Sequence, residues 1–304
     1  MILGADFIQF SLIPILIACF ASIACALPGN FLVLRRQAMV GDAISHVVLP
    51  GIVFAFLLTG TVSTWPMIGG AAFAALFAVF VIELIHKLGR IESGAAMGVV
   101  FTTMFAVGVI LLEQSDTSAV NLDVEHALYG NLESLIWLPS LAENSYLSYA
   151  ALAEIPAELW RMIGICVIFL VLLVLFWRPL KISTFDEGFA ASIGLRVATI
   201  RYSLVVCAAL AAVMAFNAVG SIIVIAMFVC PAAAARLMTN RLLSQIYISV
   251  VIAVASAMLG FILASHAPLW FGYVNTFSSA GMIAVVSGLL LALACLFGRY
   301  RMRS

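Results

Sequence analysis

Charged residues are scarce in this chain. Asp, Glu, Lys and Arg together make up 9% of its 304 residues, against about 25% in soluble globular domains. Hydrophobic residues make up 65% of the sequence, and the mean hydropathy is +1.22. This composition excludes an ordinary soluble domain and indicates an integral membrane protein. The formal net charge is zero, so no nucleic-acid partner is indicated.

Several chemical motifs are missing as well. The cysteines form no CxxC pair and no cluster, which argues against a disulfide framework and a thiolate metal site. There is no HExxH pair of the kind that metalloproteases carry. Because apolar runs occupy most of the chain, no segment is long enough to form a separate ATP-binding domain. The six cysteines are Cys19, Cys25, Cys166, Cys207, Cys230 and Cys295.

Apolar runs long enough to cross about 30 Å of hydrocarbon recur along the whole sequence. They predict an all-α polytopic membrane protein in which residues 1–304 form one transmembrane domain with about nine spans, or eight to ten. The stretch 202–238 would be about 55 Å long as one helix, so we expect a break at NAVGS, 217–221. The predicted spans are 8–27, 42–60, 66–86, 94–113, 160–178, 202–217, 219–238, 243–264 and 276–297.

The basic residues are asymmetric under one topology. If the amino terminus lies outside, all of the 14 Lys and Arg residues except Arg161 fall on the cytoplasmic side. This distribution predicts an external N-terminus and a cytoplasmic C-terminus. Residues 1–28 lack the positively charged leading region of a secretory signal, so we interpret them as the first span.

The segment GDAISHVVLPG, 41–51, is the clearest functional signal. Asp42 and His46 are four residues apart and therefore share one face of a helix. Ionisable groups in a membrane helix face protein or a water-filled path, and a carboxylate with an imidazole suits Mn(II), Fe(II) or Zn(II). The alternative is that Asp42 is a helix N-cap and that His46 is hydrogen-bonded within the bundle.

The predicted external loop, 114–159, is acidic and contains no Lys or Arg. It either concentrates cations or is an ordinary acidic outer loop. Within it, Asp123 and His126 are three residues apart and are candidates for the place where metal enters, or else solvated loop residues. His266, in the predicted outer connection after the eighth span, is a lone histidine for which we expect a packing role.

The predicted cytoplasmic segment, 179–201, contains a short amphipathic helix. Ser183 or Thr184 is the expected N-cap, the first turn holds Asp186 and Glu187, where the helix dipole favours anions, and Gly194 is expected to end the helix. Such a helix is either a docking element for a partner or an ordinary interfacial helix.

Five segments together resemble one family, the membrane permease subunit of bacterial ABC importers for divalent transition metals (the manganese, zinc and iron group, ABC-3 family). They occur in the order found in that family, and this chain adds extra residues, 142–156, to the external loop. The segments are GNFLVLRRQAMVGDAISHVVLPGIVFAFLLTG (29–60), GRIESGAAMGVVFTTMFAVGV (89–109), LDVEHALYGNL (122–132), TFDEGFAASIGL (184–195) and NAVGSIIVIAMFVCPAAAARLMTNRL (217–242).

The resemblance implies a multi-pass permease of the bacterial inner membrane that is not an enzyme and has no permanently bound cofactor. Its cargo would be Mn(II), or else Zn(II) or Fe(II). Its partners would be a second permease copy or paralogue, cytoplasmic ATP-binding subunits, a periplasmic or lipoprotein metal-binding protein, and membrane lipid.

The resemblance also assigns residues. Asp42 and His46 match the Asp and His that family members carry near the translocation path. The segment 184–195 occupies the position of the coupling helix that docks on the ATPase. The residues carried over to that contact are Asp186, Glu187, Gly188 and Gly194.

Three alternatives remain at this point. Within transport, the permease is specific for zinc or iron. From a different class, an intramembrane metalloenzyme would use Asp42 and His46 as fixed ligands, although such sites normally have at least three protein ligands. A receptor or assembly scaffold would leave the cytoplasmic helix without a role.

Overall fold

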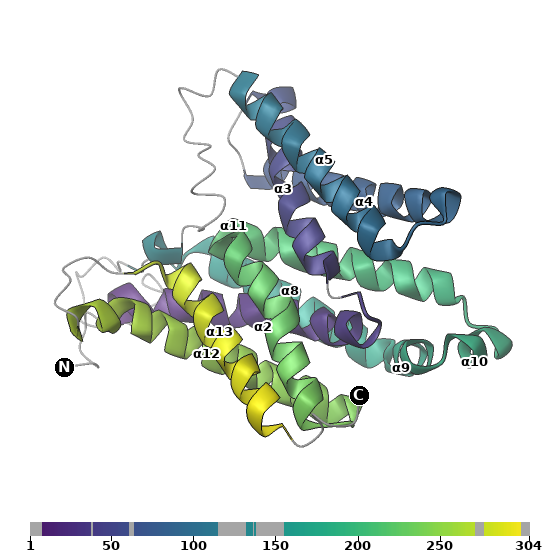
Figure 1. Ribbon diagram of the computed structural model, residues 1–304. Helices are drawn as coiled ribbons and strands as arrows, with labels where there is room; N and C mark the ends of the chain where they lie inside the picture. Colours follow the sequence, from purple (N-terminus) through teal and green to yellow (C-terminus); the bar gives the residue numbers. More distant parts are fainter. Residues whose placement is uncertain are drawn as a thin grey trace.

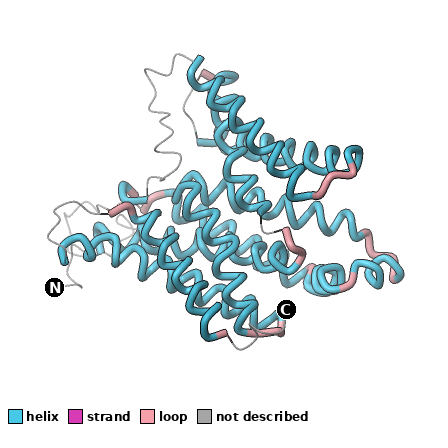
Figure 2. The backbone as a smooth tube through the Cα atoms, viewed as in Figure 1, coloured by secondary structure: helices cyan, strands magenta, loops and turns pink. Residues whose placement is uncertain are grey.

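The computed structural model describes residues 8–37, 39–60, 64–114, 132–135, 137, 155–270 and 277–298. In this part of the chain, regular structure is helical throughout and no strand occurs (Figure 2). The described residues contain nine segments that are long and apolar enough to cross a membrane. The prediction of an all-α polytopic membrane protein is therefore confirmed.

Ten α-helices and two short irregular helices make up the described part (Figure 1). The α-helices are α2 (Ile13–Leu34), α3 (Met39–Thr59), α4 (Thr64–Gly89), α5 (Ser93–Gln114), α8 (Ala157–Leu175), α9 (Trp177–Phe185), α10 (Glu187–Ser192), α11 (Val197–Met238), α12 (Leu242–Trp270) and α13 (Ser279–Phe297). A π-helix, η1 (Ile8–Leu12), precedes α2, and a 3-10 helix, η3 (Leu132–Ser134), follows α5.

The expected break in the long apolar stretch is confirmed. Gly220 interrupts α11 with φ 79° and ψ 169°, a conformation that is open to glycine and strained for other residues. The two halves of α11 form separate candidate spans, Val197–Phe216 and Ala218–Met238. They run in different directions in Figure 1.

Two predicted helix ends were wrong because helices continue through a proline. The first span was predicted to end at residue 27, but α2 runs past Pro28 to Leu34. The buried side chains of that last turn, with Phe31 and Leu32 each 1% exposed, hold it in the helix. In the same way α12 includes Pro268, so His266 lies inside a helix, where its Nδ1 is 3.0 Å from the carbonyl oxygen of Ile262, and not in a connection.

Helix α2 packs against α8, α11 and α12, while α3, α4 and α5 pack on one another and join the rest through α11 (Figure 1). A buried polar contact ties α2 to α12. Asn30 Nδ2 donates to Ser249 Oγ at 2.6 Å, and Gln245 Nε2 donates to Asn30 Oδ1 at 3.2 Å. On the opposite end of the bundle, the backbone N–H of Ser279 donates to Glu133 Oε1 at 2.8 Å, which fixes η3 to the start of α13.

Candidate functional site

Asp42 lies within α3 and not at its N-cap. The helix begins at Met39, so Asp42 is its fourth residue and the capping alternative is wrong for this position. His46 follows one turn later on the same face of the helix. The backbone therefore places both predicted residues together, as their spacing indicated, near the start of a membrane span.

The His46 ring is half-buried against two aromatic rings of α5. It stacks on Phe101, with ring centroids 5.4 Å apart and an interplanar angle of 18°, and it meets the edge of Phe105 at 5.7 Å. The two phenylalanines are four residues apart and therefore share a helix face. This contact fixes the His46 ring at the boundary between α3 and α5.

Close packing sets the position of α3 on both sides. A Cβ atom added to Gly41 would lie 2.8 Å from Cγ of Phe228 in the second half of α11. A Cβ atom added to Gly108 of α5 would lie 2.8 Å from Cβ of Pro50. Contacts this short leave room only for glycine, so α3 is seated tightly between α11 and α5.

Within the described residues, no group of three or more His, Cys, Asp or Glu lies close enough together to hold a metal ion. Asp123 and His126 lie outside the described residues. A structural metal site normally has four protein ligands and a catalytic one has three.

The predicted cytoplasmic segment forms a short helix, but its N-cap differs from the prediction. Asp186 has extended backbone angles, φ −147° and ψ 97°, and its carboxylate accepts a hydrogen bond from the Phe189 N–H at 2.8 Å. Ser183 and Thr184 lie in the last turn of α9, and their hydroxyls donate to the carbonyl of Leu180. The residue nearest to the helix therefore caps it.

Gly194 ends α10 as predicted. Its φ of +83° is in the left-handed region that favours glycine. Its N–H donates to the carbonyl of Ala191 at 3.0 Å, and the next N–H, of Leu195, donates to Ala190 at 3.0 Å. These two bonds form a Schellman motif, which satisfies carbonyls at the end of the helix. The other two residues assigned to this segment, Glu187 and Gly188, are exposed in its first turn.

Large apolar side chains are exposed around α10. Phe185 and Phe189 are each 54% exposed, and Ile193 is 50% exposed, whereas only Ala190 of this helix is buried. Phe189 and Ile193 are four residues apart along α10 and its C-cap, so they share one side of that helix, and Phe185 is the last residue of α9 just before it. Exposed apolar surface on a segment between membrane spans indicates a contact with a partner or with the membrane interface.

Arg35, which sequence reasoning missed as a functional residue, connects this segment to α2. Its guanidinium donates to Ser183 Oγ at 2.8 Å and to Thr184 Oγ1 at 3.3 Å. Burial lowers the pKa of Arg35, and the Glu187 carboxylate opposes this shift. An arginine nevertheless stays protonated in a protein. The positively charged Arg35 guanidinium therefore links the end of α2 to Ser183 and Thr184, which lie just before the Asp186 cap.

The same end of the bundle carries a second polar cluster. Glu83 of α4 accepts from Arg201 of α11 at 3.0 Å and from Lys87 at 3.2 Å. Lys87 also donates to the Tyr202 hydroxyl at 3.1 Å. His86, beside them, forms a hydrogen bond with the carbonyl of Ile91 at 2.7 Å. We call this end of the bundle, where Arg35, Lys87 and Arg201 lie, the basic end.

The chain matches the model of the ABC 3 transport family over residues 7–136 and 143–298. It is 37% identical over 275 residues to the manganese transport system membrane protein MntD of Bacillus subtilis (strain 168), covering 90% of this chain and 88% of that protein. It is 38% identical over 283 residues to the zinc transport system membrane protein TroD of Treponema pallidum (strain Nichols), covering 93% and 72%.

Among solved structures, the chain is similar to PsaBC from Streptococcus pneumoniae in complex with Fab. The sequence identity is 27%, the TM-score is 0.76, and the match covers 99% of this chain and 96% of the other. The similarity thus extends over the whole helical bundle and not over one motif.

Proposed function

Because this chain belongs to the ABC 3 transport family and is the permease subunit of a metal importer, we propose that it moves Mn(II) into the cytoplasm along a path that includes Asp42 and His46. The observation that carries this proposal is the placement of both residues one turn apart at the start of α3, with the His46 ring held between two aromatic rings of α5. An imidazole ring fixed in this way can exchange a water ligand of a passing ion without reorganising the helix.

Manganese is the first choice of cargo and zinc the second. Relatives of similar identity are named for manganese and for zinc. Carboxylate and imidazole donors accept both ions, and the usual affinity order favours Zn(II) over Mn(II), so discrimination has to come from geometry and delivery. Iron, which the sequence reading included, receives no support from the relatives described above.

A second permease copy, or a paralogue, would complete the ligand set. The described residues of one chain contain no group of three ligating side chains, and two donors from each of two chains would give four around a shared axis. A transport path needs fewer and weaker ligands than a resident metal site because the ion has to leave again. Two donors from one chain would therefore fit transport better than metalloenzyme chemistry, which normally needs three.

The segment from Phe185 to Ile193 is the proposed contact with a cytoplasmic ATPase subunit. It presents three exposed apolar side chains, and its helix is closed at both ends, by the Asp186 cap and by the Gly194 turn. The basic end of the bundle lies beside this segment through the Arg35 bonds, and the positive-inside rule assigns that end to the cytoplasm of a bacterial inner membrane. The opposite end would receive metal from a periplasmic or lipoprotein metal-binding protein.

Uptake by the reconstituted importer tests the path. Asp42→Ala and His46→Ala should each abolish uptake of Mn(II) into proteoliposomes while the permease still assembles with its ATPase subunit. Matched controls are Glu92→Ala and His86→Ala, which remove the same chemical groups near the connection between α4 and α5. Normal uptake by both α3 variants would contradict the proposed path.

A further inference from the structure

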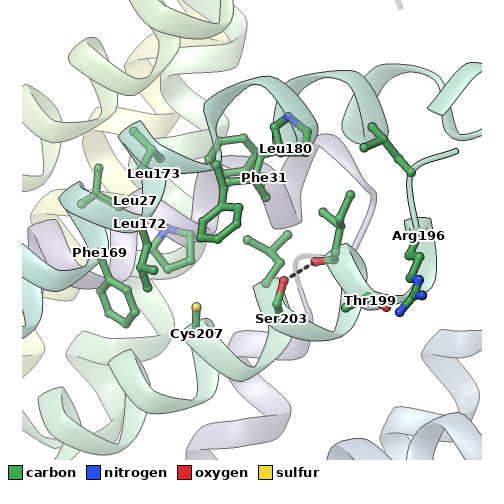
Figure 3. A pocket seen from close by; sticks show the side chains of 16 residues that line it. Leu27, Phe31, Phe169, Leu172, Leu173, Leu180, Arg196, Thr199, Ser203 and Cys207 are labelled. Atoms are coloured by element: carbon green, nitrogen blue, oxygen red, sulfur yellow. Dashed lines mark hydrogen bonds between the residues drawn. The ribbon is translucent and has the colours of Figure 1, made fainter. Parts of the chain in front are cut away.

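A deep apolar cavity of about 490 Å³ lies between α2, α8, α9 and the first half of α11 (Figure 3). Its volume is in the range of small-molecule binding sites, about 300–1,000 Å³. Of its 16 lining residues, only Arg196, Thr199 and Ser203 are polar or charged. The transport path proposed above does not use this cavity, because none of its lining residues comes from α3.

The apolar and charged groups of the lining are separated in space. Figure 3 shows Phe169, Leu172 and Cys207 together at one side and Arg196 at the other. Arg196 is exposed at the rim. The Ser203 hydroxyl donates to the carbonyl of Ile200 at 2.9 Å, so it is already used within α11. The site thus offers a long apolar interior with one permanent positive charge at its mouth.

On one side the cavity borders helix α8, whose outer face exposes apolar side chains. On the other side it borders Arg196. The outer face of α8, whose inner face lines the cavity, exposes large apolar side chains, with Leu170 at 54% and Val174 at 69%. Two further exposed cations, Arg178 and Lys181, are the sequence neighbours of the α9 lining residues Pro179 and Leu180, although neither lines the cavity itself. A membrane lipid beside α8 would therefore lie next to the helix whose other face lines the cavity.

A basic pocket between membrane helices on the cytoplasmic side is the kind of site that holds anionic lipid headgroups. We propose that this cavity binds an anionic phospholipid, with one acyl chain inside and the phosphate beside Arg196. The lining contains no carboxylate or imidazole and only one thiol, that of Cys207, so it does not suit a metal ion. A zwitterionic lipid would gain less than an anionic one from the positive charge of Arg196. A second copy of the chain would cover the cavity without needing any charge at its rim.

The site lies next in sequence to the proposed ATPase contact, Phe185–Ile193. Pro179 and Leu180 of α9 precede that segment, Leu195 and Arg196 follow it, and all four line the cavity. A lipid bound here would therefore contact the residues that flank the proposed ATPase contact on both sides. The lipid proposal does not depend on which metal is carried or on Asp42 and His46.

Lipid retention by the purified full-length permease tests the proposal. The delipidated protein is incubated with vesicles of phosphatidylglycerol or of phosphatidylcholine, re-isolated in detergent, and examined by native mass spectrometry for bound lipid. Because one basic residue near an anionic headgroup contributes about 1 kcal/mol, Arg196→Gln should lower retention of phosphatidylglycerol about fivefold. Cys207→Trp, which fills the apolar interior, should abolish it.

Matched variants separate this site from general lipid contact. Arg241→Gln removes an exposed cation in the turn between α11 and α12, and Leu210→Trp adds an indole on the same helix as Cys207 but outside the lining. Both should retain phosphatidylglycerol as the unmodified protein does. If Cys207→Trp does not fold, Leu173→Trp in α8 replaces it as the cavity-filling variant.

Three results would overturn the proposal: equal retention of the two lipids, retention unchanged in both Arg196→Gln and the cavity-filling variant, or a cavity-filling variant that changes the oligomeric state and leaves lipid binding intact. The last result would indicate a second copy of the chain as the occupant. None of them bears on metal uptake, which is measured separately on the Asp42 and His46 variants.

Discussion

The Asp186 cap provides a sharp test of the coupling segment. Its carboxylate accepts one hydrogen bond, from the Phe189 N–H at 2.8 Å, at the start of a helix of six residues. Replacing an Asp N-cap with Ala costs typically about 1 kcal/mol, which is about a fivefold shift in the local equilibrium between helix and coil. Since a helix this short is marginal by itself, Asp186→Ala should leave α10 frayed for a large part of the time.

The assay compares three variants in the importer reconstituted with its ATPase subunits. Asp186→Ala should lower metal-stimulated ATP hydrolysis and uptake by about fivefold. Asp186→Asn and Asp186→Ser keep a side-chain acceptor, so each should stay within about twofold of the unmodified protein. The midpoint of thermal unfolding should not change in any of them, because Ala190 is the only buried residue of α10.

Two outcomes would refute this reasoning in different ways. If Asp186→Asn is as defective as Asp186→Ala, the negative charge itself contacts the partner and the cap is not what matters. If Asp186→Ala is fully active, α10 does not transmit the action of the ATPase.

Three further predictions concern contacts between helices and one backbone position. Arg35→Gln should reduce coupled ATP hydrolysis severalfold, and Arg35→Lys should not restore it, because an ammonium group cannot reproduce the two directed bonds to Ser183 and Thr184. Gly220→Ala should destabilise the permease by about 1–3 kcal/mol in thermal unfolding, whereas Gly164→Ala, in α8 with open space around it, should stabilise it slightly. Gly41→Ala should cost about 1–3 kcal/mol through overpacking against Phe228 and should lower uptake. If Gly41→Ala and Gly164→Ala changed the thermal stability by the same amount, the close packing of α3 against Phe228 would be contradicted.

Hydropathy and chain length predicted most of the fold. The bilayer allows only helices of about 20 apolar residues to cross in this class of protein, so the number of spans followed from the sequence. Excess length indicated that the stretch 202–238 is broken, predicted at 217–221, and the structure places the break at Gly220. The helix ends after Pro28 and around His266 were wrong for a physical reason. Proline is only a local penalty. In α2, burial of the turn that follows Pro28 against neighbouring helices outweighs it.

The candidate site likewise has a part that local sequence patterns predict and a part that only the packing of helices reveals. The placement of Asp42 and His46 on one helix face follows from their spacing, and the end of α10 at Gly194 follows from glycine's access to positive φ. The sequence predicted both of these placements. The Phe101 and Phe105 contacts of His46 could have been suspected from two aromatic residues at i and i+4, but only the packing of α5 on α3 brings them to the ring. The Arg35 bond to Thr184 joins residues 149 positions apart, and no local pattern marks it.

The hydrogen bonds of Arg35 also join the region of α10 to the end of α2, directly before α3. The residues that it holds, Ser183 and Thr184, directly precede the Phe185–Ile193 surface and the Asp186 cap. On the other side, Arg35 is followed by Arg36, whose φ of 57° turns the chain from α2 into α3. A side chain larger than hydrogen at Gly41 would clash with Phe228, so the start of α3 is closely packed. A displacement of α10 that is transmitted through the Arg35 hydrogen bonds would therefore act on α2 and, through the turn that follows, on α3. The segment that would meet the ATPase is therefore joined, through one guanidinium and one tight turn, to the helix that carries Asp42 and His46.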